Sequence, residues 1–338
     1  MRTYRPQKPA ALLQAGTSGL RGRRGAWPET IGFVNTTPDT VRTAHLSYLP
    51  HLPHLMNADL HCHSCVSDGT LEPEALAARA KAGGVELWAL TDHDEVGGQV
   101  RARDAALREG MAYLSGCEIS VTFAGTTVHI VGLGFDIDDA ALRAGLAQTR
   151  GGREERAREM AAGLAKVGIA GAFEGSLPYV GNPELISRTH FARFLVERGH
   201  CADTSEVFRR YLTEGKPGYV PHRWAGLGDA VRWITQAGGM AVIAHPARYK
   251  FTPTEEYALF SEFKAHGGRG VEVITGSHSA AEAVKYAATA LEFELLASRG
   301  SDFHSPNESR IDLGSLPDLP ATLTPVWQAL ADRVQWPA

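Results

Sequence analysis

The sequence predicts an α/β fold, a barrel of about seven strands carrying a helical insertion. From Ala58 onward, short apolar runs alternate with stretches of helical spacing, as in repeated β-α-β units. The segment from about Ala140 to Glu214 differs, because it is rich in Ala, Arg and Glu at helical spacing and contains no convincing strand. Without this segment and the N-terminal one, roughly 200 residues remain, which is enough for one barrel.

The predicted elements follow from these runs. The strands are expected at residues 58–61, 87–91, 112–117, 127–133, 240–244, 271–274 and 295–301. Residues 73–82 are predicted to form a helix that ends at Gly83-Gly84, and a second helix is predicted to end before Gly238-Gly239. We therefore expect the barrel in residues 58–139 and 216–330 and a helical insertion domain in residues 140–215.

Residues 1–57 form a separate basic segment, with seven Arg and Lys against Glu29 and Asp39, a balance of 7 − 2 = +5. An Arg-rich, acid-poor segment is typical of a targeting peptide. We favour a disordered leader, or a start codon placed too far upstream of Met56.

Composition excludes several classes of protein. The 338 residues are 43% hydrophobic and carry a formal net charge of -4, so a general nucleic-acid surface and long duplex partners are not expected. No apolar run reaches about 18 residues, which argues against a membrane span. Four cysteines do not suggest a disulfide framework, and we expect a cytoplasmic protein. Cys62 and Cys65 lack a second pair, so packed thiols are favoured over a redox or zinc site.

Histidines and carboxylates gather at the ends of the predicted strands, where barrel enzymes assemble their sites. Residues two positions apart on a strand share a face, so His61 and His63, and also Asp302 and His304, can point at one centre. Taken alone, His129 is more typical of a hydrogen-bonded core histidine and Asp68 of a turn. Together the candidate metal ligands are His61, His63, Asp68, His93, Glu118, His129, His245, Asp302 and His304.

Nine potential ligands exceed what one ion can use. Imidazoles mixed with carboxylates suit zinc, iron or manganese. A bridging carboxylate such as Glu118 would hold two ions about 3.5–4 Å apart, as in two-metal phosphatases. The sequence thus predicts a site for two or three divalent ions.

The order of these motifs resembles the PHP (polymerase and histidinol phosphatase) family of phosphoesterases. The motifs are D-L-H-C-H-S, S-D-G-T-L, L-T-D-H-D, G-C-E-I-S, V-H-I-V-G-L, A-H-P and G-S-D-F-H, between about Asp59 and Trp327. Two further motifs, T-H-F-A-R-F-L-V and G-K-P-G-Y-V-P, resemble the branch that contains the 5′→3′ exoribonuclease RNase AM and nucleoside 3′,5′-bisphosphate phosphatases.

The resemblance implies a distorted (β/α)7 TIM-like barrel and a trinuclear, usually manganese, site. Carried over to this sequence, His61, His63, Glu118 and Asp302 would hold one ion. Asp68, His93 and His304 would hold the second. Glu118 would bridge to a third ion shared with His129 and His245.

The expected reaction is attack of a metal-bound hydroxide on phosphorus. Arg193, Arg248 and Lys216 are candidate phosphate-binding residues, because guanidinium and ammonium groups pair with phosphate oxygens. His190 or Asp94 is a candidate for relaying a proton to the leaving oxygen. The expected substrate is a small nucleotide or a short 5′-phosphorylated RNA.

Three alternatives stay open at this point. A histidinol-phosphatase-like small-molecule phosphatase would use the same ligands. A metal amidohydrolase or deaminase also carries H-x-H at its first strand, but would not need the Asp68 and His93 pair. A non-catalytic metal-binding or RNA-binding module is the third. The sequence shows no Ser/His/Asp nucleophile arrangement and no Gly-rich phosphate loop with its lysine.

Overall fold

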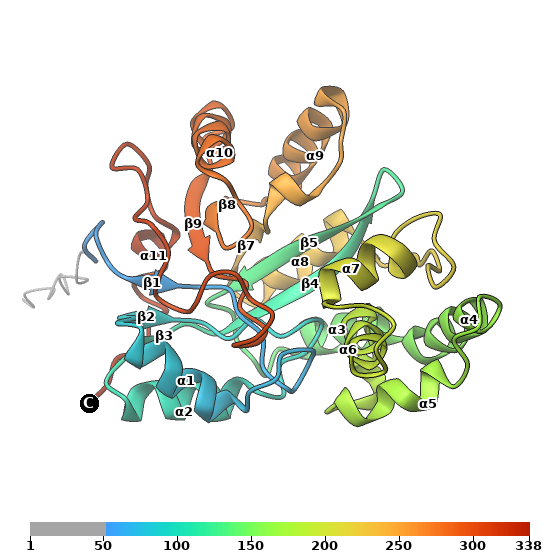
Figure 1. Cartoon of the computed structure of the whole chain (residues 1–338). Helices are drawn as coiled ribbons and strands as arrows, with labels where there is room; N and C mark the ends of the chain where they lie inside the picture. The colour runs from blue at the N-terminus through green and yellow to red at the C-terminus, as the bar shows by residue number, and fades with distance from the viewer. Residues whose placement is uncertain (1–51) are drawn as a thin grey trace, which may run out of the picture. The chain divides into compact units, whose positions relative to one another are not determined.

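The computed structural model describes residues 52–338, so nearly all of the predicted leader lies outside the described residues. The described chain has a mixed α/β fold with two sheets (Figure 1). The strands are β1 (Ala58–Asp59), β2 (Leu87–Trp88), β3 (Ala112–Tyr113), β4 (Gly116–Phe123), β5 (Thr126–Leu133), β6 (Ala225–Gly226), β7 (Met240–Ile243), β8 (Gly270–Thr275) and β9 (Leu296–Gly300). The α-helices are α1 (Pro73–Ala82), α2 (Gln99–Arg108), α3 (Ala140–Arg150), α4 (Arg153–Ala165), α5 (Ala172–Ser176), α6 (Arg188–Glu197), α7 (Thr204–Val207), α8 (Leu227–Gln236), α9 (Pro253–Ala265), α10 (Ala280–Glu292) and α11 (Val326–Ala329).

The two sheets meet at two places. Strands β1, β2 and β3 form a parallel sheet, and the second sheet has the order β6-β4-β5-β7-β8-β9. Cys62, beyond β1, forms a parallel bridge with Phe303, beyond β9. His93, beyond β2, forms a second parallel bridge with Glu118 in β4. Candidate ligands therefore lie within or beside both junctions.

The prediction of a single strand at residues 112–117 is wrong. Strand β3 ends at Tyr113, and Glu118 is the third residue of a new strand, β4. A Cβ at Gly116 would lie 2.5 Å from the carbonyl oxygen of Leu90, so only glycine allows the chain to pass so close at this break.

The prediction of repeated β-α-β units is wrong for β4 and β5, which form an antiparallel hairpin. Ala124 and Gly125 both have positive φ (46° and 77°), the conformation that a two-residue hairpin turn requires. Strand β5 then pairs antiparallel with β7. This hairpin brings His129, in β5, opposite the strand that carries Glu118.

Several helices begin and end at residue types that favour helix termini, such as Pro in the first turn, Gly at the C-cap and capping boxes. Helix α1 has Pro73 in its first turn and Gly83 at its C-cap, as predicted. Helices α9 and α10 begin with reciprocal capping boxes, Thr252 with Glu255 and Ser279 with Glu282. The largest core cluster includes apolar residues from β4, β5, β7, β8, α8, α9 and α11, and α1 and α2 pack on the β1–β3 sheet around Trp88 in a second cluster.

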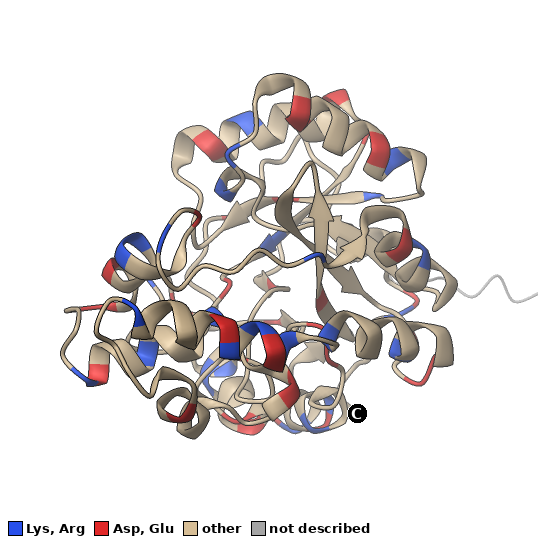
Figure 2. Cartoon of the chain, turned by 90° about the vertical axis from the view of Figure 1, so that its right-hand side faces the viewer, with Lys and Arg blue, Asp and Glu red and all other residues tan. Residues whose placement is uncertain are grey.

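Between β5 and β6 the described chain contains helices and no strand. Helices α4 to α7 form their own apolar cluster, which includes Leu164, Phe191 and Leu212. Lys and Arg alternate with Asp and Glu on the outer helices (Figure 2). None of the helices among residues 52–338 is long and apolar enough to cross a membrane.

All four cysteines are free, in agreement with the absence of a predicted disulfide framework. Cys62 is buried, and its sulfur accepts a hydrogen bond from the indole nitrogen of Trp88 at 3.2 Å. This residue is therefore a packed thiol.

Candidate metal centre

All nine candidate ligands lie together where the two sheets meet. They form four overlapping groups, and within each group the ligand atoms lie within 4.8 Å of one another. The groups are His63, Asp68, His93 and His304; His61, His63 and Asp302; His61, Glu118 and His245; and His93, Glu118 and His129. Three histidines each belong to two groups, whereas the family resemblance assigns each of them to one ion: His61, His63 and His93.

Glu118 occupies the centre of the cluster. Its side chain is fully buried, and its oxygens lie 2.9 Å from nitrogens of His93, His129 and His245. Its Oε1 faces His129 and His245 and its Oε2 faces His93, so the two oxygens are placed to bridge two ions.

The residues present fit a group of divalent cations. Burial alone would raise the pKa of Glu118, but His129, His61 and His93 hold it well below its usual range. Burial, helped by His304 and His93, lowers the pKa of His63 to about 3. An ionised carboxylate and a neutral imidazole are the forms that bind metals. Buried atoms Nδ1 of His63, Oδ1 of Asp68 and Oε2 of Glu118 also make no hydrogen bond within the described chain.

The backbone is strained at three positions of the site. Asp94, His245 and Asp302 have φ of 50°, 28° and 54°, in the left-handed region that non-glycine residues rarely adopt. Each follows a strand, and the turn directs the side chains of His245 and Asp302 into the cluster. Such strain persists where surrounding contacts hold it in place.

A buried carboxylate that the sequence did not predict orients two of the ligands. Glu272, in β8, lies with Oε1 2.7 Å from Nδ1 of His61, and its Oε2 accepts the backbone N–H of His245 at 2.6 Å. This contact holds Nδ1 of His61 and leaves Nε2 facing Glu118 and Asp302. Carboxylates in this position fix the orientation of histidine ligands and raise their basicity.

Replacing Glu272 by glutamine is therefore expected to weaken the binding of Mn²⁺ by about 10- to 100-fold. Calorimetric titration of the metal-free chain measures this change. Glu292→Gln, on the exposed face of α10, is the matched control and should leave the affinity unchanged. Equal affinities for the Glu272 variant and the wild type would contradict the assigned role.

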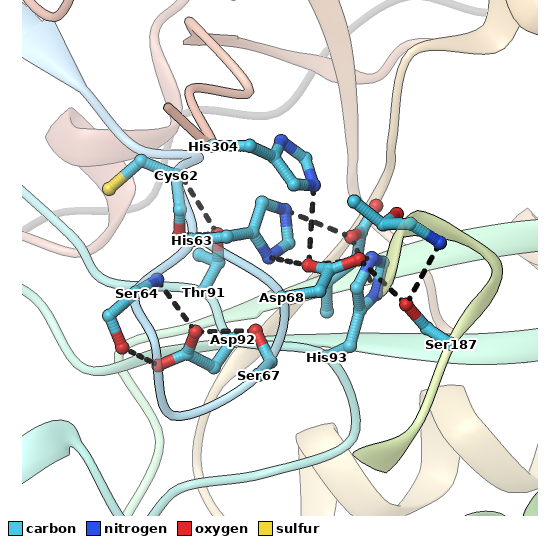
Figure 3. A network of polar contacts seen from close by, with 12 residues as sticks. Cys62, His63, Ser64, Ser67, Asp68, Thr91, Asp92, His93, Ser187 and His304 are labelled. Carbon is cyan, nitrogen blue, oxygen red and sulfur yellow. Dashed lines mark hydrogen bonds and ion pairs between the residues drawn. The ribbon is translucent and has the colours of Figure 1, made fainter. Parts of the chain in front are cut away.

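A second polar network shapes the loop that carries Asp68 (Figure 3). The buried carboxylate of Asp92 accepts hydrogen bonds from the backbone N–H of Ser64 and from the hydroxyls of Ser64 and Ser67, at 2.6–2.8 Å. Ser187, the N-cap of α6, donates its hydroxyl to Asp68 at 3.3 Å. The helical segment thus contacts a candidate ligand directly.

A cavity of about 200 Å³ opens onto the cluster. Six candidate ligands line one side of it: Asp68, His93, Glu118, His129, Asp302 and His304. Arg248 also lines this cavity, and its guanidinium pairs with Asp302. A neighbouring cavity of about 350 Å³ shares Thr189, Phe208, Arg248, Asp302 and His304 with the first, so open space continues past the metal centre.

The structure places the other predicted site residues outside the lining of this cavity. Arg193 makes a bidentate pair with Glu308, at 2.8–2.9 Å. His190 is buried, and burial lowers its pKa to about 4; its Nδ1 accepts the backbone N–H of Ser187. Asp94 is buried against Ser120 and Arg153, and Lys216 lies in an exposed turn. Of the predicted phosphate-binding residues, only Arg248 lies beside the candidate ligands.

Three arginines that the sequence analysis does not identify also line this cavity: Arg153, Arg156 and Arg188. They lie in the first turns of α4 and α6. Nothing in the residue types marks them, because Arg is common throughout this helical segment. Only the packing of α4 and α6 shows that the three side chains line the same cavity.

The fold and the nine-residue site define a PHP protein, and the chain belongs to this family: residues 59–200 match the model of the PHP domain. A 3′,5′-nucleoside bisphosphate phosphatase of Chromobacterium violaceum is 52% identical over 84% of this chain and 100% of the relative. A 5′-3′ exoribonuclease of Haemophilus influenzae is 40% identical over 80% of this chain and 97% of the relative.

Solved structures share the fold. A Chromobacterium violaceum protein described as an amidohydrolase, with bound sulfate and no metal, has a TM-score of 0.81 and 52% identity, covering 83% of this chain and 98% of that one. A Bifidobacterium adolescentis protein assigned as a metal-dependent phosphoesterase has a TM-score of 0.69 and 26% identity, covering 82% of this chain and 96% of that one.

Proposed function

We propose that this chain is a metal-dependent phosphoesterase that hydrolyses a nucleoside 3′,5′-bisphosphate or the 5′ end of a short RNA. The observation that carries the proposal is the cluster of nine ligands, six of which line a cavity that is also lined by four arginines. A phosphate ester matches both sides, because metals and guanidinium groups each pair with phosphate oxygens. Relatives that align over nearly their whole length, a bisphosphate phosphatase and an exoribonuclease, support the substrate class.

The nine residues are proposed to hold two or three divalent ions, with manganese as the expected metal. Bound ions would supply an activated water and offset charge on the phosphoryl oxygens. Glu118, at the centre, would bridge, while Glu272 keeps His61 in the orientation that ligation requires. Arg248 pairs with Asp302 and faces the cavity, so we propose that it contacts the phosphate undergoing hydrolysis.

For Arg193, the bidentate contact with Glu308 supports a role in anchoring α6 rather than in binding phosphate. Lys216, His190 and Asp94 stay predictions without a contact to the cavity. Asp94 pairs with Arg153, which does line the cavity, so an effect of Asp94 on activity is expected to pass through that arginine.

We also propose that the two sheets together form a distorted barrel. The bridges Cys62–Phe303 and His93–Glu118, together with the hydrogen bond from Leu60 N to Arg299 O, support closure between β9 and β1 and between β2 and β4. On this view residues 58–139 and 216–330 form the barrel, and residues 140–215 form a helical insertion beside the carboxyl ends of its strands.

The test is hydrolysis of adenosine 3′,5′-bisphosphate and of a 5′-phosphorylated RNA pentamer, with and without added Mn²⁺. We expect turnover that depends on the metal, and the ratio of the two rates identifies the preferred substrate. Histidinol phosphate serves as the comparison for a small-molecule phosphatase. No turnover of the bisphosphate or of the RNA would contradict the proposal, and turnover of histidinol phosphate alone would indicate the small-molecule phosphatase instead.

An amidohydrolase is the second candidate, because one closely related structure is described as such. An amidohydrolase in the strict sense would hydrolyse an amide carbon–nitrogen bond in place of a phosphate ester. The same metal-loaded protein tested on both kinds of substrate separates the two functions.

A further inference from the structure

A tyrosine hydroxyl lies between two strands that carry candidate ligands. Strands β5 and β7 pair antiparallel with Ile130 opposite Ile243, and one position further His129 faces Ala244, whose backbone N–H donates to the carbonyl oxygen of His129 at 3.1 Å. In an ordinary antiparallel pair the N–H of His129 would donate back to the carbonyl oxygen of Ala244. Here the hydroxyl of Tyr249 takes the place of that bond, because it accepts the N–H of His129 at 2.8 Å and donates to the carbonyl oxygen of Ala244 at 2.9 Å. A side chain therefore joins the two strands at the edge of the metal centre.

The same hydroxyl also contacts the ring of a candidate ligand, since it lies 3.3 Å from Nδ1 of His245. A tyrosine hydroxyl has one proton to donate and lone pairs that accept. Its proton goes to the carbonyl oxygen of Ala244, and it accepts the backbone N–H of His129. The hydroxyl can then meet Nδ1 of His245 only as an acceptor, which requires the proton of this ring to be on Nδ1. The contacts of one hydroxyl thus favour one tautomer of His245.

This tautomer is the one that can bind a cation on the side of Glu118. A proton on Nδ1 leaves the lone pair of Nε2 free, and Nε2 of His245 lies 2.9 Å from Oε1 of Glu118. Nδ1 of His129 lies at the same distance from that oxygen. Within the described chain the hydroxyl of Tyr249 makes no hydrogen bond to any other candidate ligand. Its influence is therefore directed at the two histidines that face Oε1 of Glu118.

The backbone of His245 depends on contacts of this kind. Its φ of 28° takes the chain out of the strand conformation soon after β7 ends at Ile243, and such a conformation persists only where surrounding contacts hold it. The ring of Tyr249 packs against its neighbours, with its centre 5.7 Å from that of His245 and 5.8 Å from that of Phe251. These ring contacts fix the place of the hydroxyl between the strands.

We propose that Tyr249 is a positioning residue of the metal centre, which sets the distance between His129 and the end of β7 and the tautomer of His245. This inference rests on the proposed function, because it concerns the same group of ions. Of these ions, the one held by Glu118, His129 and His245 depends on the hydroxyl. The other ligand groups contain neither of these two histidines and keep their ions without it.

The first experiment counts the Mn²⁺ ions that Tyr249→Phe binds, a variant that keeps the aromatic ring and removes only the hydroxyl. Calorimetric titration of the metal-free chain should show one ion bound about 10- to 100-fold more weakly than in the wild type, with the affinity of the others unchanged. Tyr257→Phe is the matched control, because this tyrosine of α9 is 60% exposed and its variant should bind Mn²⁺ as the wild type does. Equal weakening of every ion in Tyr249→Phe, or no weakening of any ion, would overturn the positioning role.

The metal dependence of the rate gives a second readout. Half-maximal hydrolysis of adenosine 3′,5′-bisphosphate should require about 10- to 100-fold more Mn²⁺ in Tyr249→Phe, and added metal should restore most of the rate, because the ligands themselves are unchanged. A lower rate that no concentration of Mn²⁺ restores, together with wild-type metal binding, would overturn the proposal. If the wild type binds Mn²⁺ but hydrolyses no phosphate ester, the proposed function fails, whereas the number of ions bound by Tyr249→Phe still decides the role of the hydroxyl.

Discussion

Replacing Glu118 by glutamine is expected to lower kcat/KM for adenosine 3′,5′-bisphosphate by about 1,000-fold or more, because metal ions contribute several kcal/mol to such reactions. Glu118 lies 2.9 Å from three histidines and belongs to two of the four ligand groups. An amide supplies one neutral oxygen in place of two charged ones, so it cannot bridge two cations with the same strength. The ligand set of the variant would carry one negative charge fewer, so it would bind the same cations less tightly.

The effect of Glu118→Gln on metal-dependent stability can be measured separately from its effect on catalysis. A ligand that binds only the folded chain stabilises it by about 2.7 kcal/mol at a concentration one hundred times its Kd. Addition of Mn²⁺ should therefore raise the Tm of the wild type and of the surface control Glu292→Gln, but have much less effect on Glu118→Gln. Activity within tenfold of the wild type in the Glu118 variant would show that this carboxylate does not carry the reaction.

The ligand cluster could be predicted from the sequence because most of its members follow the end of a strand, although His129 lies within β5 and Glu118 near the start of β4. His61, His93 and His245 follow short apolar runs that end in the same direction, and parallel strands place such ends side by side. The inference did not require correct strand lengths. Strands β1 and β2 are only two residues long, yet the residues after them still lie where the prediction places them.

The supporting residues could not be found in the same way. Glu272 lies inside an apolar strand, and only the register of β8 against β9 and the approach of His61 show that it faces the metal centre. Arg153 and Arg188 are two arginines among many in a helical segment, and their position depends on how α4 and α6 pack. Arg193 is predicted to bind phosphate because of its guanidinium group, but the residue type does not show that its partner is Glu308, more than a hundred residues later.

The break between β3 and β4 was missed for a different physical reason. Residues 112–117 are mostly apolar, with only Ser115 and Gly116 interrupting the run, so their pattern does not show that the hydrogen-bonding partner changes from β2 to the β5 hairpin. The clearest indication is Gly116, which allows the chain to pass close to the backbone of Leu90. A glycine within a strand pattern indicates such close approach, but it does not say which chain approaches.

Gly300→Ala is expected to have the second-largest effect, lowering the free energy of unfolding by about 2–3 kcal/mol and kcat/KM by roughly 100-fold. Gly300 ends β9 beside the residue that begins the ligand series, and an added Cβ would lie 2.2 Å from the Cβ of His61 and 2.7 Å from its backbone nitrogen. Neither atom belongs to the flexible end of a side chain. The strain can be relieved only if β1 and β9 separate, which would move His61 and His63 relative to Asp302.

Gly97→Ala is the control for this substitution. The nearest atom to its added Cβ is a carboxylate oxygen of Glu95 at 3.4 Å, which can move at little cost. Thermal unfolding, Mn²⁺ titration and hydrolysis of adenosine 3′,5′-bisphosphate by both variants measure three quantities: the Tm, the metal affinity and the turnover. If Gly300→Ala lowers the Tm but retains wild-type metal affinity and turnover, the β1–β9 contact supports the fold without positioning the ligands. If all three quantities fall together, the close packing of these two strands is what sets the geometry of the metal centre.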